Sequence, residues 1–339
     1  MSPAQRAFSH SNRVRTAHAL LDDTSMLLKL HRLVTTIDGD GLPAVHIIST
    51  HRPLLSTRRV GLFAGSFNPL TRAHLAVAEA ARQVAALDAI VWVISSATVD
   101  KERVQRASVP DRLAQLDAFV RTSASDTVAI INRGLYVQEA EALRRCLTTD
   151  TALFVLIGFD KILQIFDPHY YDDRDSALRE LFGLAHVLVA PRDNQGADAL
   201  ASLLARPENQ AFSQFVQLIP VPPEHTRDSS TEVRALAAVH PVPLHDLRLL
   251  LPPEGLALAQ TGAYAPSDGT FMGDRYALRE RWLVALAAAR VSAETPLPPL
   301  SRLVARAARP TKVGARLREW LASPATRRSP LEVRHILSV

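Results

Sequence analysis

The feature that most constrains the fold of this 339-residue chain is a repeated alternation of short apolar segments with helical ones. The apolar segments are rich in Val, Ile and Leu, which is typical of strands buried on both faces of a parallel sheet. Predicted strands lie at 45–49, 58–64, 90–94, 127–131, 153–157, 186–190 and 215–219. Predicted helices lie at 14–34, 71–86, 110–120, 137–146 and 230–239. This alternation predicts an α/β fold with a doubly wound, Rossmann-like parallel sheet flanked by helices.

Shifts in composition divide the chain into three predicted parts. An N-terminal extension with a helix and a strand covers 1–57, an α/β domain covers 58–266, and a basic helical extension covers 267–339. The last part, with helices predicted near 275–291 and 300–322, holds 13 basic and 6 acidic side chains, whereas the whole chain carries a net charge of +5. Such a tail either attracts polyanions or is a solvated helix face. Because few aromatic side chains accompany its arginines, nucleic acid is not the expected partner.

Composition also excludes several classes of protein. An apolar fraction of 47% is too high for a disordered chain, and the longest apolar run, 151–159, is too short to cross a bilayer. The single cysteine, Cys146, excludes an internal disulfide and a zinc site built from cysteines. A soluble cytoplasmic protein without a membrane partner is expected. Leu278, Trp282 and Leu286 share a helical face that packs on the body or on another subunit, so a homo-oligomer stays open.

The most informative motif runs from Gly65 to His74, where a predicted strand passes into a helix. Backbone approaches a ligand closely at Gly65, and the loop continues through Ser66 and Phe67. A helix N-terminus offers free N–H groups and partial positive charge to an anion. Thr71 and His74 are three residues apart, so they share a face of the first helical turn. The motif therefore predicts a phosphate-binding loop at the carboxyl edge of the sheet.

A second motif begins the helix predicted at 230–239. Ser229, Ser230 and Thr231 place three hydroxyl groups at its start, and Arg234 follows one turn later. Hydroxyl groups with free N–H groups wrap phosphate oxygens, and a guanidinium binds them in a bidentate manner. The alternative is an ordinary capping box formed by Ser229 and the acidic residue three positions on.

Together the two motifs resemble a known family. Gly65-Ser-Phe-Asn-Pro-Leu-Thr-Arg-Ala-His74 resembles the signature of nucleotidyltransferases with a (His/Thr)-x-x-His element, in particular nicotinamide mononucleotide adenylyltransferases. Ser229-Ser-Thr-Glu-Val-Arg234 is similar to a second segment of that family. Thr71 and Ala73 replace the His and Gly usual in bacterial members, so the chain looks closer to the eukaryotic and fungal form. The resemblance spans 58–266.

The resemblance implies roles for further residues. Gly158 and Asp160 fall in the family's Gly-x-Asp element, and Arg192 trails a strand as in the family, so all three are expected to bind nucleotide. Tyr171 is expected to stack on the pyridine ring, with packing under a loop as the alternative. Lys101 is expected to reach the triphosphate, with a solvated lysine as the alternative. The histidines other than His74 are expected to be structural or exposed.

The implied reaction joins ATP and nicotinamide or nicotinate mononucleotide to give NAD or deamido-NAD and pyrophosphate. His74 and Thr71 would stabilise charge at the α-phosphate, while Arg234, Ser230 and Lys101 would hold the β- and γ-phosphates. Mg²⁺ would be held mainly by ATP oxygens and water, without a metal site in the protein. Two alternatives remain: the same chemistry on another phosphorylated acceptor, and a non-catalytic protein that binds nucleotide or RNA.

Overall fold

The structure of the chain is a computed structural model, which describes residues 3–50, 53–96, 107–123, 125–192, 195–226, 229–239, 242–266, 271–292 and 294–323, with Val333, Ile336 and Leu337. The strands are β1 (Val45–Thr50), β2 (Arg59–Ala64), β3 (Ala89–Ser95), β4 (Thr127–Ile131), β5 (Ala152–Gly158), β6 (His186–Ala190) and β7 (Val216–Leu218). The helices up to β6 are α1 (Pro3–Asp22), α2 (Thr24–Thr36), α3 (Arg72–Ala85), α4 (Val109–Val120), α5 (Tyr136–Arg144), α6 (Phe159–Phe166) and α7 (Arg174–Leu184). They are followed by α8 (Ala197–Leu204), α9 (Ser230–Ala237), α10 (Leu244–Leu250), α11 (Pro253–Ala259), α12 (Phe271–Ala288), α13 (Leu300–Ala308) and α14 (Lys312–Ala322).

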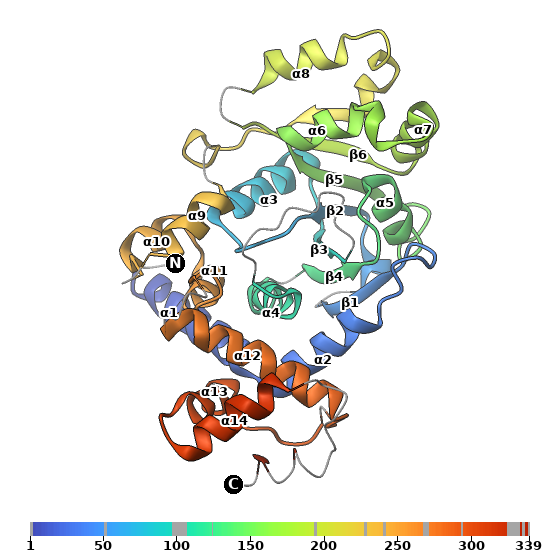
Figure 1. Ribbon diagram of the computed structural model, residues 1–339. Helices are drawn as coiled ribbons and strands as arrows, with labels where there is room; N and C mark the ends of the chain where they lie inside the picture. The colour runs from blue at the N-terminus through green and yellow to red at the C-terminus, as the bar shows by residue number, and fades with distance from the viewer. Residues whose placement is uncertain are drawn as a thin grey trace.

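One seven-stranded sheet forms the centre of the molecule, in the order β1-β4-β3-β2-β5-β6-β7 (Figure 1). All neighbouring pairs are parallel except β1 and β4, so the predicted doubly wound α/β fold is confirmed and its fully parallel sheet is corrected at one edge. The side chain of Asn132, just after β4, binds the backbone of Asp38, Leu42 and Ala44. These bonds hold the chain that enters β1, so β1 runs back along β4.

Two apolar cores cover the two faces of the sheet. Alternate side chains of the central strands enter one core or the other; Phe63 and Trp92 lie in the first, and Leu62 and Val91 in the second. Helices α1–α4 and α9–α14 contribute to the first core, and α5–α8 to the second. Burial on both faces explains why the strands read as continuous apolar runs.

Two predicted helices are each divided in the structure. The prediction at 14–34 becomes α1 and α2 because the carboxylate of Asp23 accepts a hydrogen bond from the N–H of Met26 and starts a new helix. The prediction at 300–322 becomes α13 and α14, since Pro310 interrupts the pattern and Thr311 caps the second helix. Helices α6, α7, α8 and α10 were not predicted; they are short, with 7 to 11 residues each.

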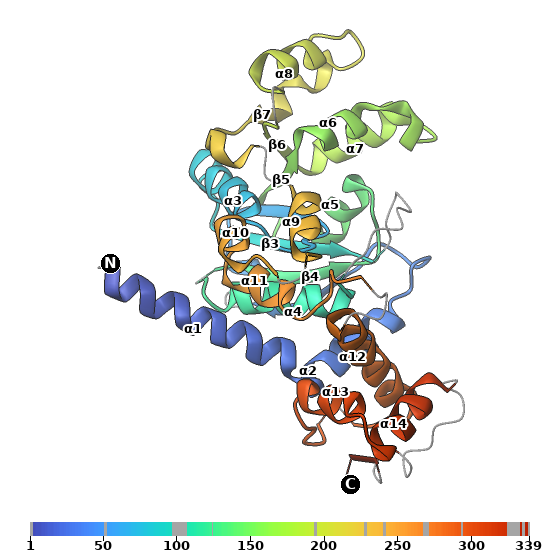
Figure 2. The same ribbon diagram turned by 60° about the vertical axis from the view of Figure 1, so that its left-hand side comes forward.

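The two extensions pack on the same side of the sheet. Helix α1 contacts α4 and α11, and α12 contacts α2, α13 and α14 (Figure 2). Leu278, Trp282 and Leu286 are buried, so this helical face packs within the chain itself. The division into parts at 57 and 266 stays a prediction. Within the described residues, no helix has the length and apolar character required to cross a membrane.

Candidate active site

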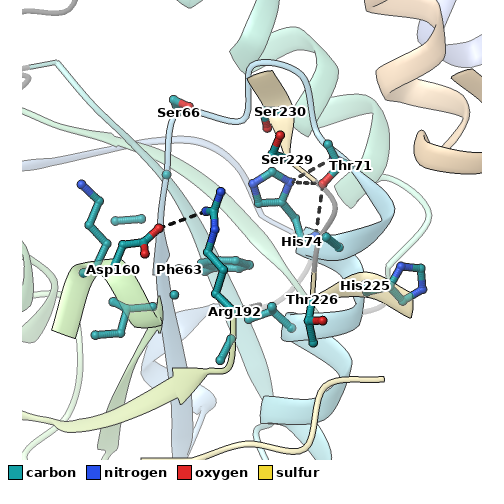
Figure 3. A pocket seen from close by; sticks show the side chains of 18 of the residues that line it. Phe63, Ser66, Thr71, His74, Asp160, Arg192, His225, Thr226, Ser229 and Ser230 are labelled. Carbon is teal, nitrogen blue, oxygen red and sulfur yellow. Dashed lines mark hydrogen bonds and ion pairs between the residues drawn. The ribbon is translucent and has the colours of Figure 1, made fainter. Parts of the chain in front are cut away.

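A cavity of about 380 Å³ lies where β2 and β5 end, at the centre of the sheet (Figure 3). The strand order changes direction here, because β3 and β4 follow on one side of β2 and β5 to β7 on the other. Open α/β sheets bind ligands at such a switch point. The cavity brings together most of the predicted site residues, namely Gly65, Ser66, Thr71, His74, Gly158, Asp160, Arg192, Ser229, Ser230, Thr231 and Arg234.

Helix α4 fixes the backbone of the loop between β2 and α3. The guanidinium of Arg112 donates to the carbonyl oxygen of Ser66 at 2.8 Å. The amide of Gln115 donates to the carbonyl oxygen of Phe67 and accepts from the N–H of Leu70, both at 2.9 Å. Arg112 and Gln115 are themselves buried, so these bonds hold the loop in one conformation.

The second motif holds the same loop from the other side. Arg234 donates to the carbonyl oxygen of Asn68 at 3.0 Å and to the hydroxyl of Thr231 at 2.9 Å. The hydroxyl of Ser230 donates to the carbonyl oxygen of Pro69 at 3.4 Å. Ser229 also caps α9, because its hydroxyl accepts from the N–H of Glu232 at 3.1 Å, which is one half of the capping-box alternative. The start of α9 therefore lies against the phosphate loop, and its hydroxyls face the cavity.

Phe67 has a buried side chain, and its predicted contact with phosphate stays a prediction. Its backbone is in the left-handed region, with φ at 42°, and its side chain is fully buried. The ring packs edge-on against those of His74, Phe63 and Trp92, with centroid distances of 5.1 to 5.5 Å. Phe67 thus forms the apolar floor beneath the imidazole and does not line the cavity.

The imidazole of His74 is held by Thr71, the N-cap of α3. Its Nδ1 accepts from the backbone N–H of Thr71 at 3.0 Å and lies 2.7 Å from the threonine hydroxyl. Because Nδ1 accepts from an N–H, the neutral ring carries its proton on Nε2. Burial lowers the pKa of His74 to about 4, so the ring is neutral at pH 7. His74 therefore offers the cavity a neutral N–H donor.

The opposite wall carries a carboxylate and a second guanidinium. Gly158 ends β5 and caps α6, which places Asp160 in the first helical turn. Asp160 forms an ion pair with Arg192, with 3.1 Å between Oδ2 and Nη1, as drawn in Figure 3. Both side chains are about half exposed. The carboxylate is therefore placed to accept hydrogen bonds from ligand hydroxyls, beside a cation.

Tyr171 is not among the residues that line this cavity, and its predicted stacking on the pyridine ring stays a prediction. It follows the 3₁₀ turn Pro168–Tyr170 and is half-buried, and burial raises its pKa to about 12. Tyr136, the first residue of α5, lines the cavity instead. The signal for Tyr136 was its place just after β4, since residues after parallel strands meet at one edge of the sheet.

Among the lining residues that were not predicted, Lys161, His225 and Thr226 carry polar side chains. His225 is partly buried, and the expectation that the remaining histidines are structural or exposed stays a prediction. The proline-rich segment after β7 forms a 3₁₀ turn, Pro223–His225, that contacts α3 and carries His225 to the cavity. Lys101 lies outside the described residues, so its predicted reach to the triphosphate stays a prediction.

Comparison with known proteins agrees with this geometry. Residues 62–236 match the family model described as cytidylyltransferase-like, so the chain belongs to this class of nucleotidyltransferases. A probable nicotinate-nucleotide adenylyltransferase from Synechococcus sp. (strain JA-3-3Ab) is 32% identical over 157 residues, which cover 44% of this chain and 72% of that protein. One from Gloeobacter violaceus is 29% identical over 155 residues, with the same coverages. Within its class, the chain is a member of the nicotinate-nucleotide adenylyltransferase family.

A solved structure gives a more distant match. The Plasmodium falciparum nicotinic acid mononucleotide adenylyltransferase complexed with NaAD is 16% identical, with a TM-score of 0.46, over 61% of this chain and 97% of that one. The closeness to eukaryotic and fungal members that Thr71 and Ala73 indicate stays a prediction.

Proposed function

We propose that this protein transfers the adenylyl group of ATP to nicotinate or nicotinamide mononucleotide, releasing pyrophosphate and forming deamido-NAD or NAD. One observation carries the proposal. His74 and Arg234 come from segments 160 residues apart in sequence, yet they line one cavity at the switch point of the sheet. An imidazole N–H and a guanidinium in one cavity form a site for a polyanion. Membership in the adenylyltransferase family supports the same reaction.

His74 acts on the α-phosphate as a neutral hydrogen-bond donor. Thr71 fixes the ring through Nδ1, which leaves Nε2–H for a phosphate oxygen. Charge that develops on that oxygen during attack strengthens the bond, so the donor favours the transition state over the ground state. Negative charge from a bound triphosphate also raises the pKa of His74 above its value of about 4. Proton transfer by His74 is not required, because the reaction expels pyrophosphate rather than a strong base.

The start of α9 receives the β- and γ-phosphates. Arg234 supplies a permanent charge, and Ser229, Ser230 and Thr231 supply hydroxyls beside the helix N-terminus. Because Arg234 also holds the carbonyl of Asn68, the triphosphate site and the loop that carries His74 form one unit. Alignment and charge neutralisation supply most of the rate enhancement in transfers of this type.

Mg²⁺ fits this site as an ion carried by the triphosphate. Among the residues that line the cavity, Asp160 is the carboxylate, and it is already paired with Arg192. The described residues contain no group of three His, Cys, Asp or Glu side chains that could hold a metal. Mg²⁺ keeps most of its water and binds phosphate oxygens readily. When bound it would neutralise triphosphate charge, while Arg234 and the hydroxyls hold the same oxygens from the protein side.

For the acceptor, Tyr136 is the aromatic side chain best placed to stack on a pyridine ring. The bacterial relatives are named as probable nicotinate-nucleotide adenylyltransferases, so the nicotinate form is the first acceptor to test. A cytoplasmic location, where ATP and mononucleotides meet, completes the proposal.

The test is a direct assay with ATP, Mg²⁺ and each mononucleotide, scored by dinucleotide and pyrophosphate formed in equal amounts. His74→Ala should lower kcat/KM by about 100- to 1,000-fold, as expected for loss of one transition-state donor. The exposed His169 lies outside the cavity, and His169→Ala is the matched control with unchanged kcat/KM. No dinucleotide from either acceptor, or full activity of His74→Ala, would contradict the proposal.

A further inference from the structure

A buried ionic cluster joins the C-terminal extension to α4. The guanidinium of Arg279 on α12 pairs with the carboxylate of Asp111 and donates to the carbonyl oxygen of Leu21. The hydroxyl of Tyr276, one turn earlier, donates to Asp111 at 2.7 Å and accepts from the backbone N–H of Ser108 at 2.8 Å. Asp111 is fully buried and Arg279 is 7% exposed. Both charges therefore depend on these partners.

The same turn of α4 contacts the phosphate loop on its other side. Arg112, next to Asp111, donates to the carbonyl oxygens of Ala107 at 3.1 Å and Ser66 at 2.8 Å. The N–H of Ala107 donates to the side chain of Asn68 at 3.2 Å. The start of α4 is thus bonded to α12 on one face and to the loop before His74 on the other.

Attachment of the extension to the body does not require this cluster. Leu278, Trp282 and Leu286 bury the apolar face of α12. Polar bonds at a distance from the cavity also fix the extension, such as that from the hydroxyl of Thr24 to the carbonyl oxygen of Pro298. The ionic cluster is distinguished by its position, because Asp111 lies next to Arg112, which holds the loop.

We propose that Tyr276 and Arg279 are positioning residues of the active site, which set the place of the Ser66–Leu70 loop through Asp111 and Arg112. The basic C-terminal extension therefore helps to position the active site, although it lies outside residues 62–236 of the family match. The expected effect on kcat rests on the proposed function. The expected effect on the position of the loop does not.

Tyr276→Phe in the full-length chain is the primary test, since it removes one hydroxyl and keeps the ring. Hydrogen–deuterium exchange of a peptide covering residues 66–71 should be faster than in wild type, because the loop opens more readily. In the adenylyl-transfer assay kcat should fall about tenfold, the equivalent of one lost positioning bond, while KM for the mononucleotide changes less than about threefold.

Trp282→Phe is the matched control on the same helix. Trp282 is fully buried, and its Nε1 has no hydrogen-bond partner among the described residues. This variant should lower the melting temperature through lost packing and leave both the loop exchange and kcat unchanged. Arg279→Lys, which keeps the charge but loses the planar fork, is the second variant and should shift both readouts in the same direction as Tyr276→Phe.

Unchanged loop exchange in both Tyr276→Phe and Arg279→Lys would overturn the inference. Equal losses of kcat in Tyr276→Phe and Trp282→Phe would overturn it too, because the extension would then act only through stability. If the wild-type protein forms no dinucleotide, the proposed function fails, and the exchange measurement alone decides whether the extension positions the loop.

Discussion

Gly255 on α11 offers a steric test of how closely the phosphate loop must be held. A Cβ added there would lie well inside 3.0 Å of the backbone carbonyl oxygen of Leu70, closer than real Cβ atoms approach. Leu70 directly precedes Thr71, which holds the imidazole. Helix α11 cannot easily retreat, because Glu254 beside Gly255 is buried and forms two 2.9 Å bonds with Arg13 on α1. In Gly255→Ala the strain therefore falls on the loop.

The relief requires a shift on the order of 1 Å, and a misplacement of that size costs about 100-fold in rate. We expect kcat/KM of Gly255→Ala to fall by about that factor, with about 1–3 kcal/mol lost from the free energy of unfolding through overpacking. Initial rates of dinucleotide formation measure the first quantity, and urea unfolding measures the second.

Gly314→Ala is the matched control. Its Cβ would meet the backbone carbonyl oxygen of Arg309 just as closely, but in the turn between α13 and α14. It should lose similar stability and keep wild-type kcat/KM. The reasoning is refuted if Gly255→Ala keeps activity within about threefold of wild type, or if both variants lose activity in proportion to their stability.

Three other predictions concern single side chains. Arg234 donates to Asn68 and Thr231 at the same time, which a lysine cannot do. Arg234→Lys should therefore raise KM for ATP about tenfold in steady-state kinetics. Because the pKa of His74 is lowered to about 4, the kcat/KM profile should be flat from pH 6 to 8 and fall only toward pH 4; a histidine inflection near 6.5 would contradict the lowered pKa. Burial raises the pKa of Glu139 from 4.5 to about 7. The folded state therefore keeps a proton that the unfolded state has released, and the free energy of unfolding falls as the pH rises from 4.5 through about 7. Glu139→Gln should therefore gain up to about 3 kcal/mol over wild type at pH 9 and almost nothing at pH 4 in urea unfolding, and equal stability at both pH values would contradict this.

The sheet was predictable because its strands are buried on both faces. Strands such as β4 and β6 are apolar after their first residues, Thr127 and His186, and have the predicted bounds. The direction of β1 was not predictable, since it depends on bonds from Asn132 to a loop that is about 90 residues away in sequence. The local pattern of apolar and polar residues does not predict contacts between residues so far apart in sequence.

The two motifs came together because each of their residues has a locally defined place. Gly65 follows a strand end, and Thr71 and Ser229 are N-caps, so the sequence alone puts them at one edge of the sheet. Tyr171 has no such local constraint.

The carbonyl groups of the phosphate loop explain why so much of the chain converges on it. From Ser66 to Pro69, each carbonyl oxygen accepts a bond from a side chain: Arg112, Gln115, Arg234 or Ser230. A carbonyl that faces a triphosphate repels it, so binding these oxygens to protein donors keeps their partial negative charge away from the ligand. The donors come from α4 and α9, and α4 is in turn held by α12. A polyanion site on this loop therefore requires helices outside the sheet as much as it requires His74.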